Sequence, residues 1–363
     1  MRAVVIGGGV AGSACAAALT RIGWDATVYE SYPDPAGPVG SFLSLATNGL
    51  RGLEALGCLP AVRAAGFAVP WQQMWSGRGK SLGRVPRARP ADSARHSITL
   101  LRADLVTALR EHAGVAIHTG RTWDGSGDPD LVVGADGIWS PTRSAIDPGA
   151  PKPRYGGMFS VAGTSDVDLE PGTFHMTYGR HATFIHVPLP TGQVWWSAQI
   201  PGDAADLTLD EVADLLEPRL ADIVRATTHK HGWTPHHVLD PVRRQHDGRR
   251  TVIIGDAAHP VGSGQGASMA IEDAVVLAQQ LRRHGTVAEA LAEYDRLRRD
   301  RLDKLAKMAA RNRDAKLAGP VASRVRDVVM PLVFPRVYPK ATNWLYDFEP
   351  GAPLTPAVPE AIG

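Results

Sequence analysis

The sequence predicts an α/β fold in three parts: a Rossmann-like dinucleotide-binding domain with a parallel sheet, an interleaved domain built on an antiparallel β-sheet, and C-terminal helices. Three observations support this prediction. A strand, a glycine-rich turn, a helix and another strand follow one another in residues 2–30. Residues 155–200 change to alternating patterns rich in β-formers. A buried strand pattern returns at 251–256, and long helical patterns follow it.

The N-terminal segment has the order of elements that a dinucleotide site requires. An apolar run at 2–6 leads into GGGVAG at 7–12, which matches G-x-G-x-x-G and opens a helix pattern. The first glycine permits the tight turn, the second leaves room for a pyrophosphate, and the third lets the helix pack close to the sheet. Unpaired N–H groups at the helix N-terminus attract phosphate. We therefore expect a dinucleotide to bind at Gly7, Gly9, Val10, Ala11 and Gly12.

An acidic residue, Glu30, ends the second strand eighteen residues after Gly12. At this place a carboxylate can accept hydrogen bonds from a ribose diol. A 2′-phosphate would meet like charge there, at a cost of up to about 4 kcal/mol at contact distance in a surface-like dielectric. The first site should therefore hold FAD or NAD rather than NADP.

Length and composition limit the classes of function. The chain has 363 residues, enough for two lobes, and a net charge of +2, too small to indicate a nucleic-acid partner. It has no apolar run of transmembrane length, and glycines interrupt the apolar start that would otherwise resemble a signal peptide. Cys15 and Cys58 are the only cysteines, and we expect no disulfide and no metal site. These features predict a cytoplasmic protein without membrane insertion. They do not determine the oligomeric state, for which we expect a monomer or homodimer.

Periodicity predicts further elements between these segments. Helices are expected at 48–56, 102–112, 209–226 and 268–283, and strands at 131–134, 183–187 and 193–200. Residues 289–317 form a helix pattern rich in Arg and Lys, which we interpret as a solvated surface helix. Pro- or Gly-rich stretches at 84–90, at 147–153 and from Pro350 punctuate the chain.

Two further motifs combine a strand end, a turn and a helix start. In GADGIWSPTR at 134–143, Asp136 can accept backbone N–H bonds within the turn. In GDAAHPVGSGQGAS at 255–268, Asp256 ends a strand, where its carboxylate can bind a sugar hydroxyl. The glycine-rich loop that follows presents N–H groups before a helix. His259 in that loop is compatible with catalysis, but we favour a structural histidine that caps the loop.

At these residues the chain resembles the FAD-dependent, single-component aromatic hydroxylases with the para-hydroxybenzoate hydroxylase fold, the group A flavoprotein monooxygenases. The resemblance implies a GR2-type Rossmann-like FAD-binding domain interleaved with a substrate domain. It covers, in order, residues 7–30, LRADL at 101–105, 134–143 and 255–274. The expected division gives 1–65, 95–155 and 248–285 to the FAD-binding domain, 66–94 and 156–247 to the substrate domain, and 286–363 to a C-terminal helical region and tail.

The resemblance also implies roles for particular residues. The glycine motif would hold the FAD pyrophosphate and Glu30 the adenosine ribose, while Arg102 would contact the pyrophosphate or ribityl region. Asp136 would order a turn that handles both FAD and the pyridine nucleotide, and Asp256 would bind the ribityl chain. The residues expected beside the isoalloxazine ring are Gly264, Gly266, Ala267 and Ser268. The chain contains only one G-x-G-x-x-G motif. This agrees with the resemblance, which implies that the reductant, NADH or NADPH, binds transiently in a groove.

By the same resemblance, NAD(P)H reduces FAD, dioxygen adds to the reduced flavin, and the resulting hydroperoxide transfers one oxygen atom to an aromatic or polycyclic small molecule. The second lobe would line the substrate pocket. Alternation places Trp195 and Trp196 on opposite faces, so one of them can point inward. A His or Tyr could act as the base for a phenolic substrate. The pocket candidates are His175, Tyr178, His186, Trp195, Trp196 and Gln199.

Two departures from the family pattern bear on fold and reaction. Relatives usually place a long β-hairpin between the second and third matching segments, where this chain has only 115–130, so we expect a trimmed fold. Relatives also have a longer loop, with a second proline next to the flavin, where this chain has only 260–263. We expect the dioxygen side of the flavin to be shaped differently here.

Three alternatives remain open. A flavin-dependent reductase or oxidase on the same fold needs no oxygen transfer, and the short loop is compatible with it. A flavin-dependent halogenase is less favoured, because such enzymes carry W-x-W-x-I-P and an active-site lysine. Here Ala198 replaces the second Trp and no Lys precedes Lys80. A flavin-binding protein without turnover would hold FAD but show no NAD(P)H-driven reduction.

Overall fold

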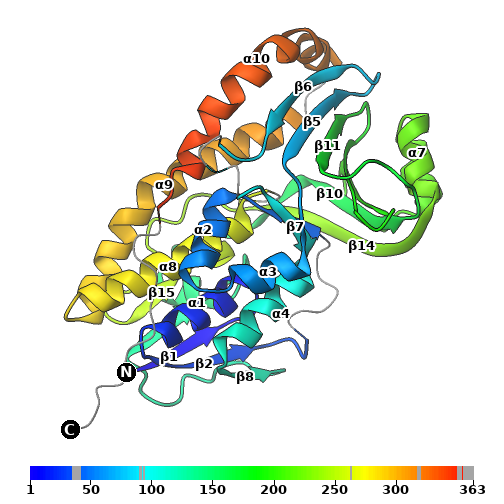
Figure 1. Ribbon diagram of the computed structural model, residues 1–363. Coiled ribbons are helices and arrows are strands. Elements are labelled where there is room, and N and C mark those ends of the chain that lie inside the picture. The colour runs from blue at the N-terminus through cyan, green and yellow to red at the C-terminus, as the bar shows by residue number, and fades with distance from the viewer. Residues whose placement is uncertain are drawn as a thin grey trace.

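The computed structural model describes residues 1–34, 42–89, 92, 95–261, 264–316, 320–349 and 354. A five-stranded sheet, with the order β15-β9-β1-β2-β8, contains only parallel pairs. Helix α1 packs against both α4 and α8 beside this sheet (Figure 1). The predicted parallel, Rossmann-like sheet is confirmed. Its elements are β1 (Arg2–Ile6), α1 (Val10–Arg21), β2 (Asp25–Glu30), α4 (Arg102–Ala113), β8 (Ala116–Thr119), β9 (Leu131–Gly134), β15 (Thr251–Ile253) and α8 (Gly266–Arg283).

Small side chains allow α1 to pack closely. Every residue from Gly12 to Leu19 is buried, and α1 contacts both α4 and α8. Cys15 lies in this run, where burial raises the pKa of its thiol to about 12, so the thiol stays protonated. Cys58 is buried as well and both cysteines are free, as expected.

A small antiparallel sheet, β3-β7-β4, lies between the parallel sheet and the second lobe. It consists of β3 (Phe42–Leu45), β4 (Phe67–Ala68) and β7 (Ile98–Leu101), with α2 (Thr47–Ala55) and α3 (Leu59–Ala65) in the same stretch of chain. Residues 115–130 are all described and hold a single strand, β8, so the fold is trimmed there as expected.

The second lobe is built on a seven-stranded sheet with the order β14-β10-β13-β12-β11-β5-β6. The predicted antiparallel sheet is mixed, because β5 enters from the first lobe and pairs with β11 in a parallel sense. The strands are β5 (Trp71–Ser76), β6 (Ser81–Pro86), β10 (Arg154–Ser165), β11 (Thr173–Tyr178), β12 (Thr183–Pro188), β13 (Val194–Pro201) and β14 (Thr227–Val238).

The single helix predicted at 209–226 is wrong. The structure has two helices there, α6 (Leu209–Asp214) and α7 (Pro218–Arg225). Pro218 occupies the first turn of α7, where its missing N–H costs nothing, but its ring restricts the preceding Glu217 to an extended conformation. Both helices bury apolar residues against one face of the seven-stranded sheet.

Two long helices, α9 (Val287–Lys316) and α10 (Pro320–Tyr346), run across both lobes (Figure 1). The charged residues of α9 form a solvated face, as predicted, but Arg298 in the middle of the helix is an exception. Arg298 is 1% exposed and pairs with Glu272 and Asp273 of α8, at 2.6 and 2.8 Å. α10 packs along β6 although it contains Pro331, Pro335 and Pro339. Within the described residues, no helix is long and apolar enough to span a membrane.

Candidate active site

The first glycine motif forms a turn with no room for side chains. Gly7 has φ +103°, in the left-handed region, and a Cβ atom on it would lie 2.3 Å from the carbonyl oxygen of Ala135. A Cβ atom on Gly12 would lie 1.8 Å from the carbonyl oxygen of Gly7. At Gly9 the nearest atom to such a Cβ is Nη2 of Arg102, at 3.4 Å. The turn is therefore bare backbone with a guanidinium over it, which suits a pyrophosphate.

Glu30, at the end of β2, is tied to this turn. One carboxylate oxygen accepts the Gly8 N–H at 2.7 Å, and the other accepts the Tyr32 N–H at 2.8 Å and the Ser31 hydroxyl at 3.3 Å. The side chain is buried. Its negative charge is thus fixed beside the turn, where it would repel a 2′-phosphate. Its contact with an adenosine ribose stays a prediction.

Arg102 begins α4 directly after β7 and connects the first motif with the third. Burial lowers the pKa of its guanidinium, and the nearby carboxylates of Glu30 and Asp256 oppose that change. Arginine remains protonated at physiological pH in any case. Arg102 therefore supplies one positive charge between the glycine turn and Asp256.

The second motif is a turn that one aspartate orders. Oδ2 of Asp136 accepts the Thr142 N–H at 3.0 Å and the Thr142 hydroxyl at 2.7 Å. Oδ1 of Asp136 is buried and has no hydrogen-bond partner among the described residues, so it can accept a bond from a ligand or water. Arg143 donates to the carbonyl oxygens of Ile138, at 2.7 Å, and Ala257, at 2.9 Å. Arg143 thus joins the second motif to the third.

The third motif closes against the first. β15 ends at Ile253, earlier than predicted, because Gly255 adopts φ +59° and starts a short 3₁₀ turn that contains Asp256. A Cβ atom on Gly255 would lie 2.7 Å from Cβ of Ala11. Oδ1 of Asp256 lies 3.5 Å from the Cβ position of Gly266, the first residue of α8. The Asp256 side chain is exposed, yet the protein around it disfavours charge and raises the pKa of its carboxyl.

A buried carboxylate holds His259. Nε2 of His259 lies 2.5 Å from Oδ2 of Asp273, an oxygen that also accepts the Gly255 N–H at 2.9 Å. Burial alone would raise the pKa of Asp273, but His259 and Arg298 outweigh it and lower the pKa to about 2. His259 therefore fixes the loop through Asp273, which confirms the structural interpretation.

The start of α8 places the remaining residues predicted beside a flavin ring. Gly264 has φ +128° and open space around it, whereas Gly262 and Ser263 lie outside the described residues. Ala267 packs against the main core. Ser268 has no exposed surface, and its hydroxyl accepts the Ala46 N–H at 3.2 Å, so it joins the start of α8 to the residue between β3 and α2.

One face of the seven-stranded sheet looks toward the three-stranded sheet and the glycine motifs. Trp195 of β13 stacks on Phe42 of β3, with ring centroids 5.8 Å apart. Gln199 lies on the same face, because alternate residues of a strand share a face. Tyr178 of β11 shares it too, since Thr183 pairs with both Gln199 and Tyr178. These three pocket candidates are therefore brought to one surface.

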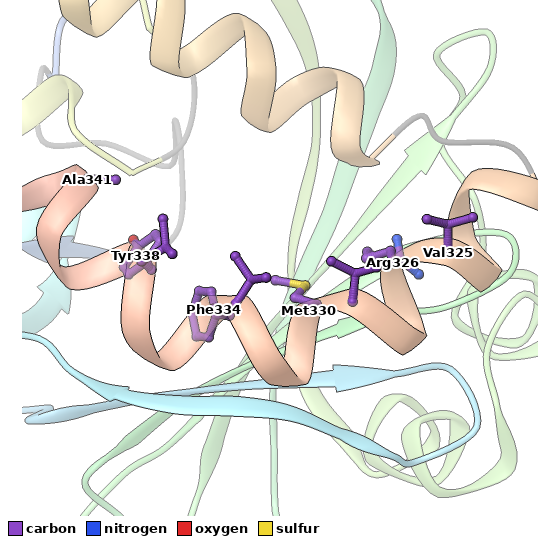
Figure 2. A pocket seen from close by; sticks show the side chains of 9 residues that line it. Val325, Arg326, Met330, Phe334, Tyr338 and Ala341 are labelled. Atoms are coloured by element: carbon purple, nitrogen blue, oxygen red, sulfur yellow. The ribbon is translucent and has the colours of Figure 1, made fainter.

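Helix α10 covers Tyr178 on that surface. The Arg326 guanidinium lies 4.2 Å from the centre of the Tyr178 ring. Figure 2 shows Arg326, Met330, Phe334 and Tyr338 following one another along α10. These four residues help to line a pocket of about 510 Å³. Burial raises the pKa of Tyr178, against the opposing effect of Arg326. Tyr178 is thus a packed phenol under α10, and Trp195 and Gln199 lie farther from the helix.

The other three candidates lie on the opposite face. Trp196 is fully buried in the cluster that α6 and α7 complete. His186 pairs across the sheet with Trp196 and stacks on His175, with centroids 4.5 Å apart and ring planes 7° apart. Trp195 and Trp196 point to opposite faces, as predicted. The structure does not bring His175, His186 or Trp196 to the surface that faces the glycine motifs.

Burial of His175 predicts an acid-sensitive stability. Desolvation, with help from Arg84 and Arg219, lowers the pKa of His175 from 6.5 to about 4. Between these two values the unfolded chain binds a proton that the native protein excludes, so stability falls as pH falls. When the pH is lowered from 6.5 to 4, the free energy of unfolding should therefore fall less in His175→Phe than in the wild type. Urea unfolding at several pH values measures this difference. The control variant His284→Phe, in the turn after α8, should show the same change in free energy of unfolding with pH as the wild type. If all three proteins show the same change with pH, the prediction is contradicted.

Sequence reasoning missed Arg87, the residue after β6. Its Nη1 lies 3.4 Å from the Ser44 hydroxyl of β3, and its guanidinium lies 4.7 Å from the centre of the Phe174 ring. Burial lowers its pKa, although the Tyr338 and Tyr346 hydroxyls oppose the change. No carboxylate pairs with Arg87 in the described part of the chain. The sequence signal for Arg87 was weak, because the Pro-rich stretch at 84–90 indicates a loop but does not show which surface that loop faces.

Comparison with known proteins agrees with this geometry. A model of an FAD binding domain matches residues 103–309, and one of an NAD(P)-binding Rossmann-like domain matches residues 5–51. The chain is 30% identical over 335 residues to aurachin C monooxygenase/isomerase of Stigmatella aurantiaca, covering 82% of this chain and 85% of the relative. The chain belongs to the FAD-binding monooxygenase family. This monooxygenase is also 29% identical over 391 residues to 3-hydroxybenzoate 6-hydroxylase 1 of Aquipseudomonas alcaligenes, covering 95% and 97% of the two chains.

Solved structures show the same fold for this monooxygenase. Klebsiella pneumoniae HpxO, complexed with FAD and uric acid, superposes with a TM-score of 0.81 at 22% identity, covering 98% of each chain. FAD is the cofactor of the family and of this enzyme. The bare glycine turn, the guanidinium above it and the open Asp256 carboxylate provide the polar groups that a flavin dinucleotide needs.

Proposed function

We propose that this FAD-dependent enzyme consumes NADH or NADPH and dioxygen and inserts one oxygen atom into an aromatic or polycyclic small molecule. One observation carries the proposal: three motifs far apart in sequence meet at one place, next to an aromatic sheet surface. Gly9 lies against Arg102, Ala11 packs on Gly255, and Arg143 reaches Ala257.

The chain's own residues would bind and orient the cofactor. The glycine turn and Arg102 would hold the pyrophosphate, Glu30 the adenosine ribose, and Asp256 the ribityl chain. Asp136 would keep its turn in place for both nucleotides. When bound, FAD supplies the redox chemistry, accepting two electrons from the nicotinamide and passing them to dioxygen. The α8 N-terminus, which follows Gly264, presents its partial positive charge to that site.

Trp195, Gln199 and Arg87 are the residues that we propose for substrate contact. Trp195 offers a half-buried aromatic surface on which a ring can stack. Arg87 places a guanidinium without a carboxylate partner in the described structure near Phe174, and such a group attracts an acidic substituent. Among the relatives, the names 3-hydroxybenzoate 6-hydroxylase and kynurenine 3-monooxygenase refer to compounds of this kind.

Isotope labelling tests the oxygen transfer. The FAD-loaded enzyme would be given NADH or NADPH and ¹⁸O₂ with a panel of aromatic acids, phenols and polycyclic compounds, and the products analysed by mass spectrometry. We expect one labelled oxygen atom in a product whose formation matches NAD(P)H consumption. A product that gains hydrogen without label would favour the reductase alternative. Peroxide as the sole product across the panel, or no NAD(P)H consumption, would also contradict the proposal.

Arg87→Met should raise KM for an acidic aromatic substrate at least tenfold. The substitution removes a charge-assisted contact that stabilises the bound substrate and the transition state equally, so it weakens binding without slowing the reaction step. Steady-state kinetics measure it, and kcat and FAD content should change little. Arg87→Lys should recover part of the affinity, and a neutral amide analogue should bind both proteins alike. If KM stays unchanged, Arg87 does not contact the substrate.

A further inference from the structure

The second lobe contains a cavity that none of the cofactor residues lines. It has a volume of about 780 Å³ and lies between β5, β11 and β12 on one side and α7 on the other. Figure 1 shows α7 on the side of the seven-stranded sheet away from α9 and α10. The volume is that of a small-molecule pocket. The lining residues that matter here are Trp71, Trp75, Arg84, His175, His186 and Arg219.

Two arginine–tryptophan pairs give this cavity positive charge on aromatic walls. Arg84 lies 4.5 Å from the centre of the Trp71 ring, and Arg219 lies 5.6 Å from that of Trp75. Neither arginine forms an ion pair with any carboxylate that the structure describes. Their charges therefore remain available to an anion that enters the cavity.

The acidic residues of the lining do not cancel this charge at the cavity floor. Glu170 and Asp222 line the cavity and both are exposed. Asp222 lies 3.6 Å from Arg225 of its own helix. The floor is instead formed by imidazole rings, which burial keeps neutral near pH 7.

The two histidines provide a flat surface and one unused polar atom. Trp75 donates its indole N–H to Nδ1 of His175 at 3.1 Å, so neutral His175 carries its proton on Nε2. His186 stacks on His175 and is 8% exposed. Nδ1 of His186 is buried and has no partner among the described residues. A buried polar atom of this kind is satisfied when a ligand or water binds beside it.

We propose that this cavity is a second binding site, on the opposite face of the sheet from the FAD-binding motifs, for a planar aromatic carboxylate. The indole and imidazole rings offer faces on which an aromatic ring stacks, and Arg84 and Arg219 offer fork-shaped donors to its carboxylate. The site needs no turnover, so it stands independently of the proposed reaction.

Calorimetric titration of 2-naphthoate into the FAD-loaded enzyme tests this site, with 2-naphthamide as the neutral probe. We expect saturable binding of 2-naphthoate, weakened at least tenfold in the double variant Arg84→Gln/Arg219→Gln and unchanged in Arg249→Gln, an exposed arginine outside the lining. 2-Naphthamide should bind at least tenfold more weakly. Both arginines are exposed, so the variants should fold, and melting temperature and FAD content verify that they do.

Two further measurements separate this site from the FAD-binding face. Binding to the far face should leave the flavin absorbance spectrum unaltered and should persist in Arg87→Met. His186→Phe keeps the ring stack but removes Nδ1, and should weaken binding severalfold. The proposal is overturned if 2-naphthoate does not bind at millimolar concentration. It is equally overturned if the double variant binds like the wild type, or if binding is lost in Arg87→Met.

Discussion

Gly12→Ala should abolish stable FAD binding, with at least a hundredfold weaker affinity. The new Cβ atom would lie 1.8 Å from the carbonyl oxygen of Gly7 and 3.3 Å from Cγ1 of Val5. The first of these neighbours is backbone, which cannot rotate away as a side chain does. The turn must therefore open, and its N–H groups leave the positions from which they would bind a pyrophosphate. Overpacking of this kind also costs about 1–3 kcal/mol of stability.

FAD content after purification and the dissociation constant of FAD for the apoprotein measure this effect. Gly285→Ala is the matched control, since a Cβ atom there meets nothing within 4 Å, and it should bind FAD like the wild type. A second variant, Arg102→Gln, separates misfolding from the loss of a binding contact. It removes a charge without adding bulk, and it should still weaken FAD binding about tenfold. Wild-type FAD affinity in Gly12→Ala would refute the placement of the pyrophosphate at this turn.

Local patterns predicted the strands, helices and turns of the three motifs well. The glycine spacing at 7–12, the helix that follows it and the acid at the end of the second strand all depend on residues close in sequence. The positive φ of Gly7 and the contact of Gly12 with its carbonyl oxygen are the physical reasons for that spacing. The same holds for the turn that Asp136 orders through Thr142. Such features can be predicted because the interacting groups are neighbours along the chain.

The substrate side depended on contacts that no local pattern contains. Alternation places Trp195 and Trp196 on opposite faces, but only the packing of α6 and α7 decides which face is covered. Arg87 is one of three arginines in the stretch 84–90, and its position relative to Ser44 and Phe174 arises from pairing between distant strands.

The C-terminal helices show the same limit. The charges of α9 resemble those of a surface helix until Arg298 is seen to meet two carboxylates of α8. The prolines of α10 indicate a break by local rules, yet packing along β6 keeps the helix. In both cases tertiary contacts override the local preference.

Arg298→Met should destabilise the protein by about 3–5 kcal/mol, because it leaves the carboxylates of Glu272 and Asp273 buried with one cation fewer. Both carboxylates are fully buried, and Arg298 donates to them at 2.6 and 2.8 Å. The melting temperature should fall on the order of 10 °C. Arg296→Met, which removes an arginine 68% exposed on the same helix, should change the free energy of unfolding by less than about 1 kcal/mol. Equal losses in the two variants would show that the buried network does not carry the stability.

The pH dependence of the stability lost in Arg298→Met tests whether Asp273 is the source of that loss. Although burial opposes ionisation, His259 and Arg298 lower the pKa of Asp273 from 3.8 to about 2 in the native protein. The carboxylate therefore contributes stability that is fully present above pH 3.8 and lost as pH falls toward 2. Without Arg298 its native pKa rises, so the difference in free energy of unfolding between wild type and Arg298→Met should be constant near neutral pH and shrink below pH 4. Because Asp273 also binds the Gly255 N–H and His259, the same variant should loosen the loop that carries Asp256 and lower FAD affinity as well. A deficit that is independent of pH down to pH 3 would assign the lost stability to packing around the arginine stem.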